Sequence, residues 1–96
     1  MLGIIYCATN TVNGKRYVGQ TVRSLKRRWQ FHLKSAKDGS ECTLHRAIRK
    51  YSAEAFKVEQ IDFAESPEDL NEKEVRYILL LKTLTPNGYN LRELYT

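Results

Sequence analysis

The chain has 96 residues, of which 42% are hydrophobic and 10% aromatic. A chain of this length can enclose one modest core, so we expect a single domain over residues 1–96 and no second one. No apolar run approaches the roughly 20 residues that a membrane-spanning helix needs, and the N-terminus lacks the basic leader and long apolar stretch of a secretory signal. We therefore expect a cytoplasmic protein.

The net charge of +5 is unevenly distributed. Residues 1–50 contain 11 Lys and Arg but two acidic residues, whereas residues 51–96 contain five basic and nine acidic residues. A basic surface attracts phosphate backbones through counterion release, so nucleic acid is the leading class of partner. On charge alone, an ordinary solvated basic surface explains the pattern equally well.

Two segments rich in β-branched and aromatic residues open the chain, residues 3–9 and 15–20. The Asn13-Gly14 pair between them is a strong turn signal, so the segments predict a β-hairpin. A two-residue turn and a longer loop are both compatible with this sequence.

The rest of the chain predicts three helices, one further strand and a short closing segment, and hence an α/β (α+β) fold. Ser24 and Gly39 are start and stop signals for the first helix, and Ser66 followed by Pro67 begins the last one. The strand contains one break in its apolar alternation, after Val58. In chain order we expect helices over residues 25–38 and 43–51, a strand over 55–63, a helix from 67 to about 82, and a closing segment over 89–91.

The two cysteines, Cys7 and Cys42, are far apart and form no CxxC pair. In a cytosolic chain of this size such cysteines are more often reduced thiols than a disulfide. A zinc site with His32 and His45 is disfavoured, because structural zinc sites draw their ligands from closely spaced pairs. The functional prediction therefore uses neither cysteine.

Glu74 interrupts the apolar stripe of the last helix, which is formed by Leu70, Tyr77, Ile78 and Leu81. A carboxylate on a core-facing stripe loses hydration, which costs several kcal/mol unless a cation, hydrogen-bond donors or a metal compensates it. Such a carboxylate is a candidate for function. The alternative is a glutamate at the edge of the stripe, or one paired with an arginine for structural reasons.

Arg28 and His32, spaced i and i+4, lie along one border of the apolar stripe of the first long helix. Arginine suits the charge that develops on a phosphate during hydrolysis, and histidine can relay a proton near neutral pH. The alternative is an arginine that lies across the rim of the core beside a purely structural histidine. The remaining basic residues of this helix point elsewhere and would hold only the DNA backbone: Lys26, Arg27, Lys34 and Lys37.

Tyr6, Tyr17 and Gly19 share one face of the predicted hairpin, because side chains alternate along a strand. A glycine beside two phenols leaves space for a ligand to approach, although tyrosine in a strand more often fills the core. A loop longer than two residues would bring the two tyrosines closer together.

These residues also resemble a known family. Gly3-Ile-Ile-Tyr6, followed after ten residues by Tyr17-Val-Gly-Gln-Thr21, is similar to the two motifs that name the GIY-YIG nucleases. The resemblance continues through Arg28-Trp29 with His32, Glu74 with Tyr77-Ile78, and the segment Asn87-Gly-Tyr-Asn90, in the family's order. The first motif has an extra isoleucine and the second has Val18 in place of isoleucine, and neither departure removes a functional side chain. The resemblance spans the whole chain and its wording is closest to phage-type homing endonucleases.

The resemblance implies a small three-stranded antiparallel sheet flanked by three helices, with an active site on one concave face. It implies that Glu74 binds one divalent ion, Mg²⁺ or Mn²⁺. Tyr6 would be the general base or position the water, and Arg28 would clamp the phosphate. The supporting roles that it implies are proton movement for Tyr17 and His32, orientation of neighbouring groups for Asn90, close backbone approach at Gly19, and binding of the DNA backbone by Lys26, Arg27 and Lys34.

The predicted function is therefore metal-dependent hydrolysis of DNA phosphodiester bonds by a monomeric domain in the cytoplasm of a bacterial host cell. One alternative is a structure-specific repair nuclease. Others are a nucleic-acid-binding module with the same fold and no chemistry, and a plain structural or protein-binding domain. Homing members use a separate C-terminal DNA-binding region, which these 96 residues do not include. We therefore expect either a catalytic domain cut from a longer protein or a free-standing nuclease of low sequence specificity.

Overall fold

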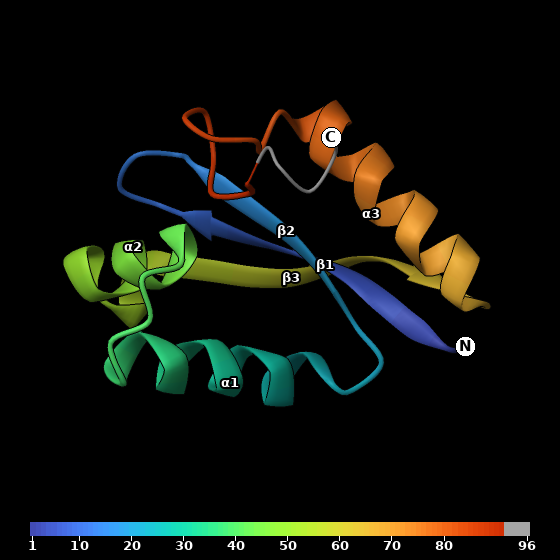
Figure 1. Ribbon diagram of the computed structural model, residues 1–96, viewed down its shortest axis with the longest axis horizontal. Coiled ribbons are helices and arrows are strands. Elements are labelled where there is room, and N and C mark those ends of the chain that lie inside the picture. The colour runs from blue at the N-terminus through green and yellow to red at the C-terminus, as the bar shows by residue number, and fades with distance from the viewer. Residues whose placement is uncertain (92–96) are drawn as a thin grey trace.

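The computed structural model describes residues 1–91 and contains an antiparallel sheet in the strand order β2-β1-β3, with helices on both faces (Figure 1). The predicted fold is confirmed, and no predicted element end differs from the observed one by more than one residue. The elements are β1 (Gly3–Asn10), β2 (Arg16–Thr21), α1 (Leu25–Lys37), α2 (Thr43–Tyr51), the 3₁₀ turn η1 (Ala53–Ala55), β3 (Phe56–Ala64) and α3 (Pro67–Leu81).

Side chains cap the N-termini of the two long helices. The Ser24 hydroxyl accepts the backbone N–H of Arg27 at the start of α1, and the Ser66 hydroxyl accepts that of Asp69 at the start of α3. Each bond satisfies a backbone donor that the helix itself leaves unpaired. Both helices therefore begin where the sequence indicates.

The hairpin uses the longer of the two loops that the sequence allows. The backbone N–H of Asn10 donates to the Lys15 carbonyl at 2.9 Å, so residues 11–14 form the loop, and Gly14 adopts a positive φ of 78°. In this register Tyr6 lies opposite Gly19 and Tyr17 lies opposite Ala8. The two tyrosines are thus diagonal neighbours on one face, with ring centroids 6.2 Å apart.

A β-bulge in β3 explains the break in its apolar alternation. Ile5 of β1 pairs with Asp62 and Tyr6 pairs with Gln60, so Ile61 has no partner on β1. The extra residue moves every later side chain of β3 to the other face. Ile61 consequently packs with the apolar cluster under α3, whereas Val58 packs with the cluster under α1 and α2.

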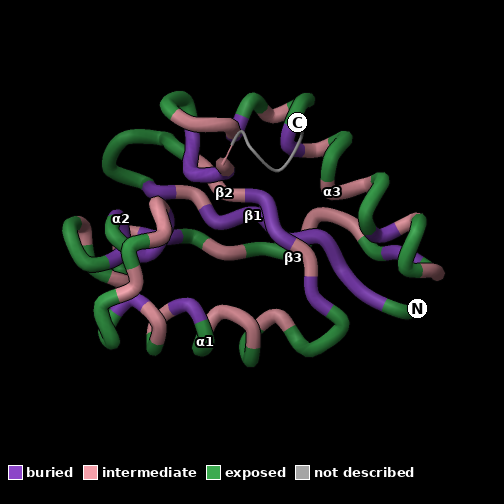
Figure 2. The backbone as a smooth tube through the Cα atoms, in the orientation of Figure 1, coloured by how far each residue is buried: buried purple, intermediate pink, exposed green. Residues whose placement is uncertain are grey.

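The sheet separates two apolar clusters. Figure 1 shows α1 and α2 on one side of the sheet and α3 on the other. Ala8 of the central strand contributes to the first cluster, whereas Ile5 contributes to the second cluster, with Leu70 and Ile78 of α3. The central strand β1 is accordingly buried along almost its whole length (Figure 2).

The segment after α3 covers the outer edge of β2. The backbone N–H of Tyr89 donates to the Arg16 carbonyl at 3.0 Å, and the Asn90 side chain bonds both the N–H and the carbonyl of Val18, each at 2.9 Å. A β-carbon at Gly88 would clash with backbone atoms of Thr83 and Arg16, which accounts for a glycine there. An exposed strand edge is a site for unwanted pairing, and this segment removes most of it.

Cys7 is buried, Cys42 is partly buried, and both are free thiols, as expected. Among residues 1–91, no helix is both long enough and apolar enough to cross a bilayer. Residues 92–96, which lie outside the described part of the chain, include none of the predicted site residues.

We expect Ile78→Ala to lower the free energy of unfolding by about 2–5 kcal/mol, because it leaves a cavity between α3 and the sheet. Ile78 is fully buried, whereas its neighbour Leu79 is 59% exposed. Leu79→Ala, the matched control, should change that free energy by no more than about 0.5 kcal/mol. Urea unfolding of both variants measures the difference, and equal losses would contradict the described orientation of α3.

Candidate active site

Tyr6, His32 and Arg28 form the centre of the candidate site. The Tyr6 side chain is fully buried, and its hydroxyl oxygen lies 2.7 Å from Nε2 of His32. Arg28 Nε donates to the same oxygen at 3.4 Å. Strand β1 presents the phenol, and one face of α1 presents the other two side chains. His32 is 3% exposed, so it lies deeper than the border position that the sequence predicts.

Tyr17 and Gly19 complete the hairpin side of the site. The Tyr17 ring packs edge-on against the His32 ring, with centroids 5.6 Å apart. A β-carbon at Gly19 would lie 2.5 Å from Cζ of Tyr6 and 2.9 Å from Cε2 of Tyr17. Because those distances are too short for a carbon contact, only glycine lets the Tyr6 ring lie flat against β2.

Glu74 approaches the site from the other face of the sheet, beside the edge strand β2. It is half-buried between Leu70 and Ile78 on α3, as the apolar stripe predicts. Its Oε1 accepts a hydrogen bond of 3.1 Å from the Gln20 amide, and no ion pair involves it within residues 1–91. Burial raises the pKa of Glu74, and this effect is partly offset by the Gln20 hydrogen bond and the charge of Arg28.

The Glu74 charge acts on both phenols. It contributes to a raised pKa at Tyr6 and at Tyr17, where burial is the largest cause in each case. At Tyr6 the hydrogen bond and charge of Arg28 oppose that rise. The structure therefore brings Tyr6, Tyr17, Arg28 and Glu74 within electrostatic range of one another.

The donor set fits a single divalent ion. No group of three or more His, Cys, Asp or Glu side chains is gathered in the part of the chain that the structure describes. Glu74 is instead a desolvated carboxylate with one hydrogen bond, from the Gln20 amide, so its remaining lone pairs can bind a cation. Mg²⁺ binds through one or two carboxylates together with waters and substrate phosphates, which suits this arrangement.

A chain of hydrogen bonds continues from His32 to the partly exposed Ser40, and sequence reasoning missed it. Nδ1 of His32 lies 2.8 Å from Nε2 of His45 on α2, and Nδ1 of His45 lies 2.7 Å from the Ser40 hydroxyl. Burial lowers the pKa of His32 to about 3, helped by Arg28 and His45, so this imidazole is neutral. Only one feature of the sequence pointed to this chain of hydrogen bonds. That feature is His45, which lies next to Leu44 at the edge of the apolar face of α2.

Arg28 can only donate, and one consistent set of directions for these bonds follows when Tyr6 donates to His32. The Tyr6 oxygen accepts from Arg28, so the Tyr6 hydroxyl proton is free to donate to Nε2 of His32. A neutral His32 then carries its proton on Nδ1 and donates to His45, which in turn donates from its own Nδ1 to Ser40. The four groups form one aligned chain of donors.

The predicted substrate-binding residues differ in their positions. Arg27 and Arg28 line a cavity of about 320 Å³ beside the site, together with Arg23 and the half-exposed ring of Phe31. Lys26 is exposed on the same helix, whereas Lys34 is paired with Asp38 at 2.8 Å.

Asn90 lies away from the phenols, and its side chain is fully engaged. It bonds the backbone of Val18 and accepts the Thr83 hydroxyl at 2.7 Å. Through Val18 it fixes the backbone between Tyr17 and Gly19. Its place in the structure is therefore that of a positioning residue, one step from the phenols.

A three-stranded sheet with these tyrosine, arginine and glutamate side chains defines a GIY-YIG catalytic domain. The model of that domain matches residues 2–90, and the chain belongs to this family.

Two solved structures of an endonuclease catalytic domain resemble the chain. The structure of the catalytic domain of homing endonuclease I-TevI covers 93% of this chain and 97% of that one, with 28% identity and a TM-score of 0.80. A mutant of the same catalytic domain, described as that of an intron endonuclease, covers 94% and 93% of the two chains, with 30% identity and a TM-score of 0.80.

A curated relative comes from Invertebrate iridescent virus 6, where it is called uncharacterized protein 019R. It is 32% identical over 98 residues, which is 99% of this chain and 35% of the viral protein. The chain thus spans about a third of the length of that relative.

Acid should destabilise the domain through His32. Below its ordinary pKa of 6.5 the unfolded chain binds a proton at His32, whereas the folded chain does so only near pH 3. The free energy of unfolding should therefore fall as the pH falls from about 6.5, by up to about 1.4 kcal/mol per pH unit for this group. His45, whose pKa burial also lowers, acts in the same direction, whereas Glu74, whose pKa burial raises, acts in the opposite one.

Urea unfolding between pH 5 and 6.5 tests this. His32→Gln removes the titrating group. The slope of its free energy of unfolding against pH should therefore be smaller, by the equivalent of up to one bound proton. A slope as steep as that of the unsubstituted domain would show that His32 does not titrate as described.

Proposed function

We propose that this domain is a metal-dependent endonuclease that hydrolyses phosphodiester bonds in DNA. The observation that carries the proposal is the contact of Arg28 with the buried Tyr6 hydroxyl, within electrostatic range of the half-buried carboxylate of Glu74. A module that only holds DNA has no use for a desolvated carboxylate close to phosphate. The likeness to the I-TevI catalytic domain supports the same conclusion.

Arg28 is placed to bind the scissile phosphate. Its Nε is bonded to Tyr6, and the cavity that it lines with Arg23 and Arg27 opens beside the site. A planar guanidinium offers paired donors to phosphate oxygens, which gather negative charge as water attacks. Arg23 and Arg27 then contact neighbouring phosphates.

Glu74 would hold the divalent ion. When bound, this ion supplies positive charge to the phosphate and its leaving oxygen and favours the deprotonation of water. Burial raises the pKa of Glu74, so a bound cation would compensate the hydration that this carboxylate has lost.

Tyr6 takes the proton from the attacking water. As that proton moves to the phenolate oxygen, a bond forms between the water oxygen and phosphorus, and the bond to the leaving oxygen breaks. The leaving oxygen takes its proton from solvent. Tyr6 must therefore lose its own proton before each cycle, although burial raises its pKa.

The chain of His32, His45 and Ser40 provides a route for that proton. Tyr6 donates to Nε2 of His32 while His32 releases the proton on its Nδ1 to His45. His45 passes its Nδ1 proton to Ser40, which releases its hydroxyl proton to solvent. Both imidazoles stay neutral but now carry their protons on Nε2, and the new phenolate accepts one bond from Arg28 and one from His32. Their neutrality matters because a charged His32 is strongly disfavoured. Each imidazole must exchange its proton back to Nδ1 before the chain can act in the next cycle.

I-TevI is a homing endonuclease, and this chain matches about a third of the viral relative. Both findings further support a nuclease domain that acts within a larger protein. We propose that target selection involves residues outside this domain.

Glu74→Ala and Arg28→Ala should each abolish the nicking of supercoiled plasmid in Mg²⁺, with a loss of about 10²–10³-fold or more, because each removes charge compensation from the transition state. EDTA should abolish nicking by the unsubstituted domain. Arg76→Ala is the control, since Arg76 is an exposed residue of α3 that pairs with Glu72 on the same helix. Equal nicking by all variants, or none by any protein in any metal, would favour a binding module.

His45→Gln should lower kcat about 10- to 10²-fold near pH 7 with little change in KM, because glutamine cannot accept one proton while releasing another. The loss of kcat in this variant should shrink as the pH rises, because Tyr6 then loses its proton directly to solvent. Single-turnover cleavage from pH 6 to 10 measures this. A rate that is lower by the same factor at every pH indicates a packing defect and contradicts the relay.

A further inference from the structure

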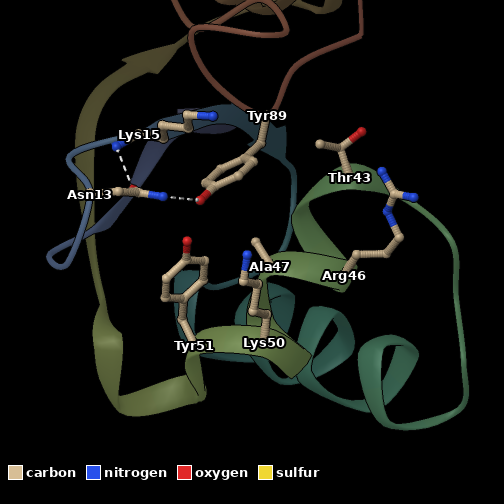
Figure 3. Close-up of a pocket in the computed structure, with 8 residues that line it drawn as sticks. All are labelled: Asn13, Lys15, Thr43, Arg46, Ala47, Lys50, Tyr51 and Tyr89. Atoms are coloured by element: carbon tan, nitrogen blue, oxygen red, sulfur yellow. Dashed lines mark hydrogen bonds between the residues drawn. The ribbon is translucent and has the colours of Figure 1, made fainter.

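A second cavity lies at the far end of the sheet, away from Tyr6 and Glu74. It has a volume of about 380 Å³ and lies between the hairpin loop, α2 and the segment after α3 (Figure 3). Lys15 of the hairpin and Arg46 and Lys50 of α2 line it. No acidic side chain lines it, and none of these three cations forms an ion pair within residues 1–91.

The buried Tyr89 side chain presents an unused donor to this cavity. Tyr89 is 6% exposed, and its oxygen accepts the amide of Asn10 at 3.1 Å and that of Asn13 at 3.3 Å. The amide orientations are fixed, since the oxygen of Asn10 accepts Val12 N–H and that of Asn13 accepts Lys15 N–H. In these contacts the Tyr89 oxygen only accepts, so its hydroxyl proton is available to a ligand in the cavity.

The start of α2 adds to the positive character of the cavity. Thr43, the first residue of α2, lines it, and the N-cap residue Cys42 makes no side-chain capping bond. The first turn of α2 also lacks an acidic residue. In Figure 3 the Lys50 amino group and the Tyr51 hydroxyl point from α2 toward Tyr89. The Lys50 amino group and the Tyr51 hydroxyl thus face Tyr89, whereas Arg46 lies beside Thr43 at one side of the cavity (Figure 3).

We infer that this cavity binds a backbone phosphate of the DNA substrate at a distance from the scissile bond. The inference rests on the proposed function for its choice of DNA. A phosphate accepts several hydrogen bonds and carries the charge that three unpaired cations require. Lys15 and Gly19 are four residues apart, which in an extended chain is about 13 Å. This length is similar to that of about four base-pair steps of a duplex. One duplex can thus reach both sites.

Binding to a fluorescent 20-base-pair duplex in EDTA, over a series of salt concentrations, tests the inference without cleavage. Lys15→Gln/Lys50→Gln should weaken binding about tenfold and reduce the slope of log affinity against log salt by about 0.9, the value for one phosphate. The control Lys57→Gln/Lys82→Gln removes equal charge from two exposed lysines outside the cavity. Equal affinities and equal slopes in the two double variants overturn the inference.

Thr43→Glu separates binding from folding. A carboxylate in the first turn favours the helix, so the Tm should stay the same or rise, while the same charge repels a phosphate from the cavity. Weaker duplex binding at an undiminished Tm supports the inference, and undiminished binding overturns it.

Plasmid nicking decides the nuclease proposal separately. If the unsubstituted domain nicks plasmid but the two double variants bind the duplex equally well, only the inference about the phosphate cavity is wrong. If the domain never nicks but the lysine variant loses affinity and slope, the cavity stands and the nuclease proposal fails.

Discussion

The hydrogen bond between the Tyr6 hydroxyl and His32 is the interaction on which the rest of the site depends. It joins the central strand to α1 at 2.7 Å inside the protein, where both groups are almost fully buried. A buried phenol without a partner would cost on the order of 1–3 kcal/mol. The bond therefore helps to fix the position of α1 relative to the sheet, and with it the position of Arg28, one turn before His32.

The glycine at position 19 is the second constraint. Tyr6 can lie over β2 only because its partner in the register has no side chain. The Asn90 side chain holds the neighbouring Val18 backbone from the outside, so the strand under the ring does not depend on the hairpin alone. The segment after α3 thus supports the site without contributing a group to its chemistry.

The elements, and the faces on which most candidate-site residues lie, could be predicted because they follow from local rules, whereas the three-stranded sheet was expected from the family resemblance. Glu74 falls at the predicted place because a helical period puts it between Leu70 and Ile78, and the tyrosines share a face because strands alternate. The His45–Ser40 extension could not be predicted, since it depends on the packing of α2 against α1. The bulge at Ile61 left a trace in the sequence, the break in alternation, but only strand pairing shows which residue is extra.

The desolvation that makes Tyr6 a poor acid also determines how a proton can leave it. A lone histidine at position 32 could take that proton only by becoming charged beside Arg28, and burial makes that state unfavourable. When the neighbouring ring and hydroxyl accept the next proton together, no charge develops inside the protein until the phenolate forms against Arg28. In the proposed mechanism the neutral relay and the placement of Arg28 therefore depend on each other, because a base as deeply buried as Tyr6 can act only if its proton leaves without charging the groups that carry it.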